Sequence, residues 1–125
     1  MKLEIGMYVR IEKGIYKINN YINNNYTQKY TYIDNKGISN ILEEKEIIKA
    51  SRNIIDLIEA GDYVNGLRVE KSKYGKLYTS YTYMGGDIGL QQETYTTFLK
   101  DYGEDDVYSI LTREQFESMS YKVDE

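Results

Sequence analysis

Hydrophobic and polar residues alternate in short runs along most of this chain, and such alternation is typical of β-strands. In residues 5–18, "IGMYVRIEKGIYKI", Gly14 separates two runs of this kind, so the segment predicts a hairpin. Residues 26–33, "YTQKYTYI", predict a third strand, because Tyr, Thr and Ile all favour extended backbone. Asn-rich and Gly-containing turns at 23–25 and 34–37 bound this strand on either side.

The stretch that follows is more ambiguous. After the strand "ISNIL", residues 43–50, "EEKEIIKA", predict either a final short strand or a turn of helix, with Ile47 and Ile48 anchored in the core. A short helix is then predicted over 53–60, because Asn53 is a favourable N-cap and Ile54, Leu57 and Ile58 share one face. Gly61 is expected to end that helix.

The second half of the chain also alternates. Asn65-Gly66 predicts a tight hairpin, the turn at 73–76 leads into a strand over 77–84, and 85–87 turns the chain again. Residues 88–99 predict a strand or a short helix. The predicted 77–84 strand carries Tyr78, Ser80, Thr82 and Met84 on one face and Leu77, Thr79, Tyr81 and Tyr83 on the other.

The C-terminal segment predicts a second helix. Thr112 and Gln115 have the spacing of a capping box, in which a hydroxyl and an amide side chain reciprocally satisfy free backbone N–H groups. A helix over 113–119 is therefore expected, with Phe116 and Met119 facing inward, followed by a terminal strand over 120–123.

These elements predict a mainly β (α+β) fold. The expected architecture is a set of small, bent antiparallel sheets, or a partial barrel of the Src-homology-3 (SH3-like) kind, with two short helices. A chain of 125 residues fits a single compact domain over 1–125. The alternative is two β-subunits, 1–50 and 61–125, joined by the helix at 53–60.

Composition excludes several kinds of chemistry. The chain has no Cys and no His, so it has no disulfide, no Cys/His zinc site and no catalytic triad or dyad that uses imidazole. We therefore expect a protein that is not an enzyme and that has no cofactor, no metal site and no catalytic residue. The 20 acidic and 16 basic residues give a net charge of −4, which disfavours nucleic acid as a direct partner.

The sequence also bears on location. No apolar run approaches the roughly 18–20 residues that a membrane helix needs. The N-terminal residues lack the apolar segment of a signal peptide. A cytoplasmic protein with no membrane partner is expected.

Two glycine-rich loops, 61–66 and 85–89, were tested as phosphate sites. Neither has the Lys-Ser/Thr of a P-loop, and neither follows a strand and opens a helix, so both are interpreted as turns. The lysines near the 77–84 strand, Lys71, Lys73 and Lys76, interleave with Tyr and would suit base stacking, but ordinary sheet packing is favoured over that function.

Tyrosine and acidic residues supply the candidate contact surface. The chain has 15 Tyr against 2 Phe, which reflects either AT-rich codon usage or selection for interface contacts. The acidic residues Asp101, Glu104, Asp105 and Asp106 form either a solvated loop, a site for a hard cation, or a patch that meets a basic groove on a partner. The candidate partner-binding residues are Tyr78, Tyr81, Tyr83, Asp101, Glu104, Asp105 and Asp106; the simpler interpretation of the same residues is sheet packing plus a solvated loop.

Three stretches together, "IGMYVRIEKGIYKI", "SRNIIDLIEAGDYVNGLRV" and "SILTREQFESMSYKV", resemble small uncharacterised proteins encoded in phages and prophages of low-GC bacteria such as Clostridium. The similarity covers about half of the chain and leaves out residues 26–40 and 71–106. It carries no catalytic or binding residue over to this chain.

The resemblance implies a viral context, in which small acidic proteins often inhibit host defence machinery, anti-CRISPR proteins among them. The function expected on that basis is steric inhibition of a bacterial defence effector, for example a CRISPR effector nuclease. The alternatives are a small nucleic-acid or nucleotide-binding β-module and a virion or assembly component.

Overall fold

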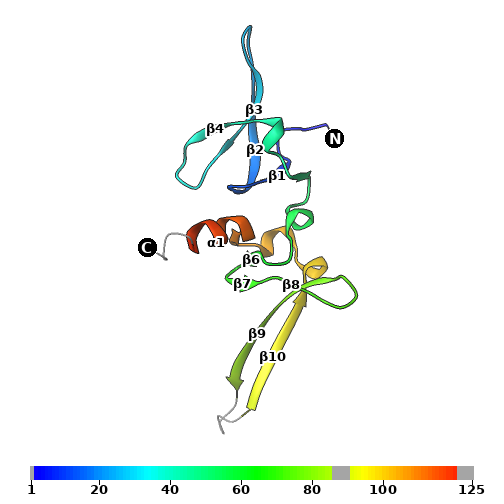
Figure 1. Ribbon diagram of the computed structural model, residues 1–125. Helices are drawn as coiled ribbons and strands as arrows, with labels where there is room; N and C mark the ends of the chain where they lie inside the picture. Colours follow the sequence, from blue (N-terminus) through cyan, green and yellow to red (C-terminus); the bar gives the residue numbers. More distant parts are fainter. Residues whose placement is uncertain (1, 86–90, 121–125) are drawn as a thin grey trace.

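The strands of this protein form three small antiparallel sheets in the part of the chain that the computed structural model describes, residues 2–85 and 91–120 (Figure 1). The mainly β prediction is confirmed. The sheets remain open and do not close into a barrel. Two long hairpins project from the body in opposite directions, and the short elements lie between them (Figure 1).

The first sheet has the strand order β4-β3-β2-β1-β5. Its strands are β1 (Tyr8–Ile11), β2 (Gly14–Asn23), β3 (Gln28–Ile33), β4 (Ser39–Leu42) and β5 (Lys49–Ser51). The predicted hairpin around Gly14 is confirmed, with Ile11 opposite Gly14 in the register. The predicted turn at 34–37 is confirmed by the hydrogen bond from Gly37 N to Asp34 O (3.0 Å).

The ambiguous residues after β4 adopt both predicted conformations. A 3-10 turn, η1 (Glu44–Glu46), is followed by β5, which pairs with β1. Ile47 packs against the core, as expected, whereas Ile48 is 53% exposed, so its predicted anchoring role is wrong. The two residues differ because neighbouring side chains point to opposite sides of an extended segment.

The helix predicted over 53–60 is a single 3-10 turn, η2 (Ile54–Leu57). Asn53 caps it as predicted, since its side chain accepts a hydrogen bond from Ile55 N (3.1 Å). The chain is already extended at Ile58, so Gly61 does not end a helix. Helix nucleation is unfavourable in so short a segment, and the extended backbone instead places buried Ile58 in the hydrophobic core.

Two three-stranded sheets make up the rest of the fold, in the orders β11-β6-β7 and β10-β9-β8. Their strands are β6 (Tyr63–Val64), β7 (Leu67–Arg68), β8 (Glu70–Lys71), β9 (Leu77–Gly85), β10 (Gln91–Phe98) and β11 (Ile110–Leu111). The Asn65-Gly66 hairpin is confirmed, with φ of 53° and 84° at its two turn residues. Such paired positive values define the turn that matches the natural twist of a hairpin.

The segment between β10 and β11 contains two further 3-10 turns, η3 (Leu99–Asp101) and η4 (Glu104–Asp106). The ambiguous 88–99 stretch is thus mainly strand where it is described. The predicted turn after Gly85, and the terminal strand beyond Ser120, fall at residues outside the described part of the chain.

The C-terminal α1 (Arg113–Ser120) begins with the predicted capping box. Thr112 N donates to Gln115 Oε1 (2.8 Å), and Gln115 N donates to the Thr112 hydroxyl (3.2 Å). The predicted inward orientation holds in part for Phe116, whose ring packs against Tyr63 with centroids 5.1 Å apart while the residue stays 45% exposed; it is wrong for Met119, which is 57% exposed. The helix docks mainly through its first turn, where Glu114 bonds to buried Arg10.

Two groups of buried apolar residues stabilise the described part of the fold. The cluster under the first sheet contains Met7, Val9, Ile11, Ile18, Tyr32 and Leu42. The cluster beneath the other two sheets contains Ile58, Val64, Val69 and Leu99. Arg10, which is 0% exposed, lies on β1 beside the first cluster and reaches to Asp62 at the edge of the second.

Candidate functional site

The hairpin formed by β9 and β10 displays an aromatic pair on one face. Tyr81 lies directly opposite Tyr95 in the register, and their rings stack with centroids 5.4 Å apart and planes 23° apart. Tyr81 and Tyr95 are 50% and 44% exposed, because this hairpin projects from the body of the protein. Large, stiff side chains with a polar tip are the type most enriched at protein interfaces.

The structure separates the three candidate tyrosines. Tyr78 lies on the opposite face of β9 from Tyr81, is partly buried, and packs edge-on against Phe98 with centroids 6.0 Å apart. The side chain of Tyr83 lies outside the described residues. Tyr95, which the sequence analysis did not single out, joins Tyr81 instead. No signal in the sequence indicates this pairing, because it depends on the register of two strands.

The base of this hairpin is fixed to the body. Thr79, 1% exposed, shares a hydrogen bond with the hydroxyl of Tyr102 (2.7 Å). Leu77 and Leu99 pack in the adjoining hydrophobic cluster. The aromatic pair is thus held at a defined position by a rigid base, which reduces the entropy lost on binding.

All four acidic candidates are exposed, and they lie in the two 3-10 turns at the base of the hairpin. Asp101 ends η3, and Glu104, Asp105 and Asp106 form η4. The segment is not a loose loop, because Asn65 forms four hydrogen bonds with residues 106–109: its backbone N donates to Ser109 O (2.9 Å), and its side chain makes three more. The Asn65 amide donates to Asp106 O (2.8 Å), and its oxygen accepts from Tyr108 N (2.7 Å) and Ser109 N (3.1 Å).

One acidic side chain links this segment to the first sheet. The Tyr8 hydroxyl donates to Glu104 Oε1 at 2.8 Å, across 96 residues of sequence. Burial raises the pKa of Tyr8 above its ordinary value, and the hydrogen bond and the negative charge of Glu104 raise that pKa further. Glu104 is therefore partly used within the fold, whereas Asp105 in the same turn is exposed and its side chain forms no hydrogen bond or ion pair with the described residues.

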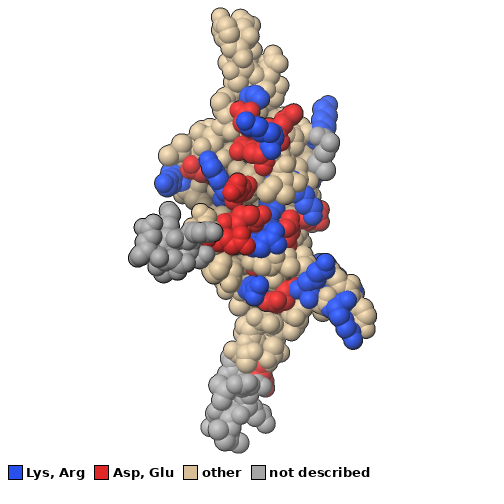
Figure 2. Space-filling view, viewed as in Figure 1, with Lys and Arg blue, Asp and Glu red and all other residues tan. Residues whose placement is uncertain are grey.

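Charge is unevenly distributed over the molecule. Lys, Arg, Asp and Glu gather over its middle, and the upper hairpin of Figure 2 ends without charge. In the sequence, residues 18–28 contain no charged side chain, and β9 contains none either. β10 contains a single one, Glu93. The outer parts of both projecting hairpins are thus mostly Tyr, Thr, Asn and Gln, and the ion pair of Lys29 with Glu43 (3.0 Å) lies on the β2–β3 hairpin below its tip.

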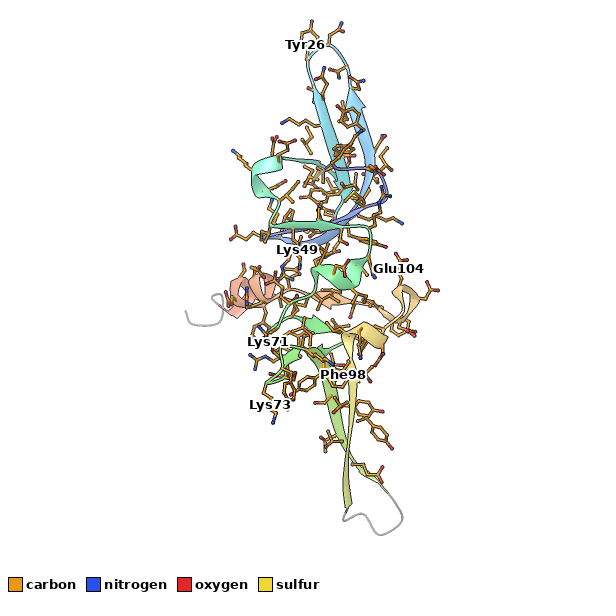
Figure 3. The ribbon with its side chains drawn as sticks, turned by 90° about the vertical axis from the view of Figure 1, so that its right-hand side faces the viewer. Tyr26, Lys49, Lys71, Lys73, Phe98 and Glu104 are labelled. Carbon is orange, nitrogen blue, oxygen red and sulfur yellow. The ribbon has the colours of Figure 1, made fainter. Side chains whose placement is uncertain are left out.

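The tip of the β2–β3 hairpin presents another exposed aromatic side chain, Tyr26, at the far end of the molecule (Figure 3). Its side chain is 96% exposed. The turn beneath it is ordered by Asn24, whose side-chain oxygen accepts from Tyr26 N (2.8 Å) and Thr27 N (2.7 Å). The sequence predicted this turn but gave no reason to single out Tyr26.

A buried ionic cluster joins the two halves of the fold, and sequence reasoning missed it. The Arg10 guanidinium donates to both Asp62 oxygens (2.5 and 2.8 Å), to Glu114 Oε2 (2.7 Å) and to Leu57 O (2.9 Å). Burial by itself lowers the pKa of Arg10, but the hydrogen bonds to Asp62 and Glu114 raise it above its usual value. The single guanidinium faces both the Asp62 and the Glu114 carboxylates and bonds to each, and such an internally paired charge suits a structural role.

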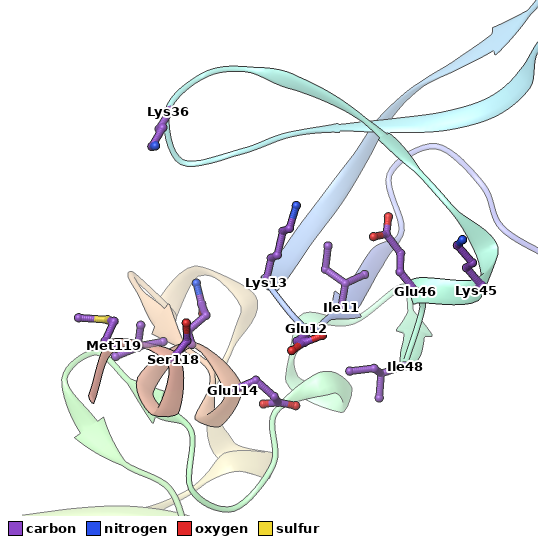
Figure 4. Close-up of a pocket in the computed structure, with 12 residues that line it drawn as sticks. Ile11, Glu12, Lys13, Lys36, Lys45, Glu46, Ile48, Glu114, Ser118 and Met119 are labelled. Atoms are coloured by element: carbon purple, nitrogen blue, oxygen red, sulfur yellow. The ribbon is translucent and has the colours of Figure 1, made fainter. Parts of the chain in front are cut away.

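An open groove of about 1130 Å³ runs between the first sheet and α1 (Figure 4). Ile11, Ile48 and Met119 line it together with side chains of both charge signs. In the close-up, the labelled side chains of the sheet and of α1 stand on opposite sides of the opening. Among the described residues, no group of three or more Asp, Glu, His or Cys side chains is placed to hold a metal ion.

No protein-family model, curated protein or solved structure matches this chain. A search of the described residues found no helix long and apolar enough to cross a membrane.

Proposed function

We propose that this protein is a non-enzymatic, phage-type inhibitor that binds a bacterial defence effector and blocks it sterically. The observation that carries the proposal is the exposed Tyr81–Tyr95 stack on a projecting hairpin with a fixed base. A rigid aromatic pair of this kind supplies contact area at a small cost in conformational entropy.

The acidic segment supports the choice of partner. Asp101 and the residues of η4 place several carboxylates next to the base of the hairpin, held there by Asn65. A negative surface beside an aromatic anchor complements a basic groove, and complementary fields speed association with such a groove. Nucleic-acid-handling effectors have basic grooves because they bind phosphate backbones.

The proposed mechanism is occlusion. The hairpin enters or covers the basic channel, the tyrosines provide most of the affinity, and the carboxylates provide orientation and rate of association. The resemblance of three stretches of the chain to phage and prophage proteins supports a defence system as the target. A CRISPR effector nuclease is one member of that target class.

The experiment combines a functional assay with a matched substitution. The protein is expressed in bacteria that carry a defined defence system, and phage plating efficiency is measured together with affinity for the purified effector. Tyr81→Ala is expected to weaken binding about thirtyfold, as for an interface residue worth about 2 kcal/mol. Tyr74→Ala serves as the control, because Tyr74 is 79% exposed on the β8–β9 turn and outside the aromatic pair.

Two results would count against this function. The first is an absence of protection and binding across a panel of defence systems. The second is an equal loss of affinity for the effector in Tyr81→Ala and Tyr74→Ala, which would show that the stacked pair has no special role in binding.

One observation favours the nucleic-acid-binding alternative. Lys71 and Lys73 lie beside the base of the β9–β10 hairpin (Figure 3), and the Lys73 ammonium lies 5.1 Å from the ring centroid of Tyr74. Exposed lysines next to an exposed ring are able to contact phosphates and stack a base. Retention of a 20-nucleotide single strand that falls steeply with salt, and that Lys73→Gln weakens, would support this function over inhibition.

A further inference from the structure

Within the described part of the chain, no strand pairs with the outer edge of β9 along most of its length. In the three-stranded sheet, β9 lies between β10 and β8, but β8 pairs only with Leu77 and Tyr78. From Thr79 to Gly85, no described strand pairs with the side of β9 that faces away from β10. A two-stranded ribbon is at best marginally stable by itself in water.

The direction of the backbone groups at this edge follows from the β8–β9 turn. Ser72 N donates to Lys76 O (2.8 Å), which makes these two residues a hydrogen-bonded pair. Hydrogen-bonded and non-hydrogen-bonded pairs alternate in an antiparallel ladder. The N–H and C=O of Ser80 and Thr82 therefore point to the outer edge.

The side chains agree with this assignment. Thr82 lies opposite Thr94, and their hydroxyl oxygens are 2.8 Å apart. Side chains come this close in non-hydrogen-bonded pairs, whose backbone groups point away from each other. Thr82 thus presents its N–H to the outer edge of β9, and Thr94 presents its N–H to the outer edge of β10.

The edge lacks the features that usually prevent strand pairing between molecules. Such features are charged side chains, proline and bulges. The chain contains no proline, β9 contains no charged residue, and its register with β10 runs without a shift from Tyr78 to Gly85. An edge of this kind is a template for another strand.

We propose that β9 pairs with β9 of a second copy of this protein, so that two hairpins form one four-stranded antiparallel sheet. An antiparallel strand edge is self-complementary about a twofold axis, so identical edges satisfy each other's N–H and C=O groups in a closed dimer. The net charge of −4 does not oppose the contact, because the charges lie on the body and not on β9.

The dimer brings the aromatic pairs together. Tyr81 and Tyr95 of each copy share one face of their ribbon, and the joined sheet presents two such pairs on a single rigid surface. If the protein binds an effector through these tyrosines, the dimer is bivalent. The proposed dimer does not depend on the proposed function, since it needs no partner other than the protein itself.

The test is the solution mass of the full chain as a function of concentration. Multi-angle light scattering and sedimentation, from about 1 µM to about 1 mM, are expected to show the mass rising from 14.7 kDa towards twice that value. Thr82→Pro removes one outward N–H of β9 without removing a bond to β10. It is expected to weaken dimerisation at least tenfold.

Two matched variants make the result specific. Thr94→Pro makes the same change at the outer edge of β10 and should leave the dimer intact. Thr82→Val keeps the N–H and should also leave it intact. Circular dichroism checks that each variant folds.

A protein that stays monomeric up to 1 mM would overturn the proposal, and so would a dimer that survives Thr82→Pro. An equal loss of dimerisation in Thr94→Pro would contradict pairing through β9. A solution mass that keeps rising beyond the dimer with concentration would contradict a closed dimer. None of these results depends on whether an effector is bound.

Discussion

The buried pair of Arg10 and Asp62 gives the sharpest prediction for stability, through the substitution Asp62→Asn. Each Asp62 oxygen accepts two hydrogen bonds. Oδ1 accepts from Arg10 Nη2 and Arg113 N (both 2.8 Å), and Oδ2 accepts from Arg10 Nη1 (2.5 Å) and Glu59 N (2.7 Å). An asparagine amide has one oxygen, so in either orientation its NH₂ group faces two donors.

The expected cost follows from this geometry and from burial. Both side chains of the pair are 0% exposed, so the substitution leaves the Arg10 charge buried with a weaker set of acceptors. Removing one partner of a buried ion pair costs about 3–5 kcal/mol. Domains of this size are stable by only about 5–15 kcal/mol. Asp62→Asn is therefore expected to remove a large part of the free energy of unfolding.

Urea unfolding followed by circular dichroism measures this effect. A loss of 3–5 kcal/mol lowers the midpoint by roughly 1–5 M urea at slopes of about 1–3 kcal/mol per M. Asp56→Asn is the control, because Asp56 is exposed and, among the described residues, its side chain accepts a hydrogen bond only from the Ser51 hydroxyl (2.8 Å). A change below about 1 kcal/mol for Asp62→Asn would refute the reasoning. The double variant Arg10→Met, Asp62→Leu removes both charges and should be more stable than Asp62→Asn.

Three further predictions concern local structure. Thr112→Ala removes the N-cap of α1 and should lower the free energy of unfolding in urea by about 1 kcal/mol. The control Ser118→Ala, on the exposed part of the helix, should change it by less than half of that. Equal effects of the two substitutions would contradict the capping role of Thr112. Asn65→Gly keeps the turn, since glycine accepts positive φ, and keeps the bond from the backbone N of residue 65 to Ser109 O. It removes the three side-chain bonds to residues 106–109, so amide hydrogen exchange should accelerate at Ser109 and stay unchanged in β1–β2. The hydrogen bond from the backbone N–H of Ile38 lowers the pKa of Asp34 below 3.8. The ionised Asp34 side chain therefore stabilises the fold above pH 3.8, and this contribution is lost as the pH falls through the lower pKa of the folded state. An NMR titration that places the Asp34 pKa at or above 3.8 would contradict this prediction.

The features that the sequence predicted correctly depend on interactions between residues that are close together in the chain. The turns at 23–25, 34–37 and Asn65-Gly66 and the capping box of α1 were predicted correctly, because each depends on residues within a few positions of one another. Strand alternation predicted the antiparallel, mainly β class for the same reason. It also assigned Tyr78 and Tyr81 correctly to opposite faces of β9.

Contacts between distant residues decided the rest. Arg10 and Asp62 are 52 positions apart, so no local pattern marks them as partners. Their ion pair, together with Glu114, docks α1 through its first turn, which is why Phe116 remains partly exposed despite its apolar side chain. The extended segment after Leu57 has a similar origin, because Ile58 gains more from burial in the second cluster than a short helix gains from its own hydrogen bonds. The sequence determined the turns, the cap of α1 and most of the strands, whereas the tertiary structure decided the conformation of the segment after Leu57 and which faces of the elements are buried or remain available to a partner.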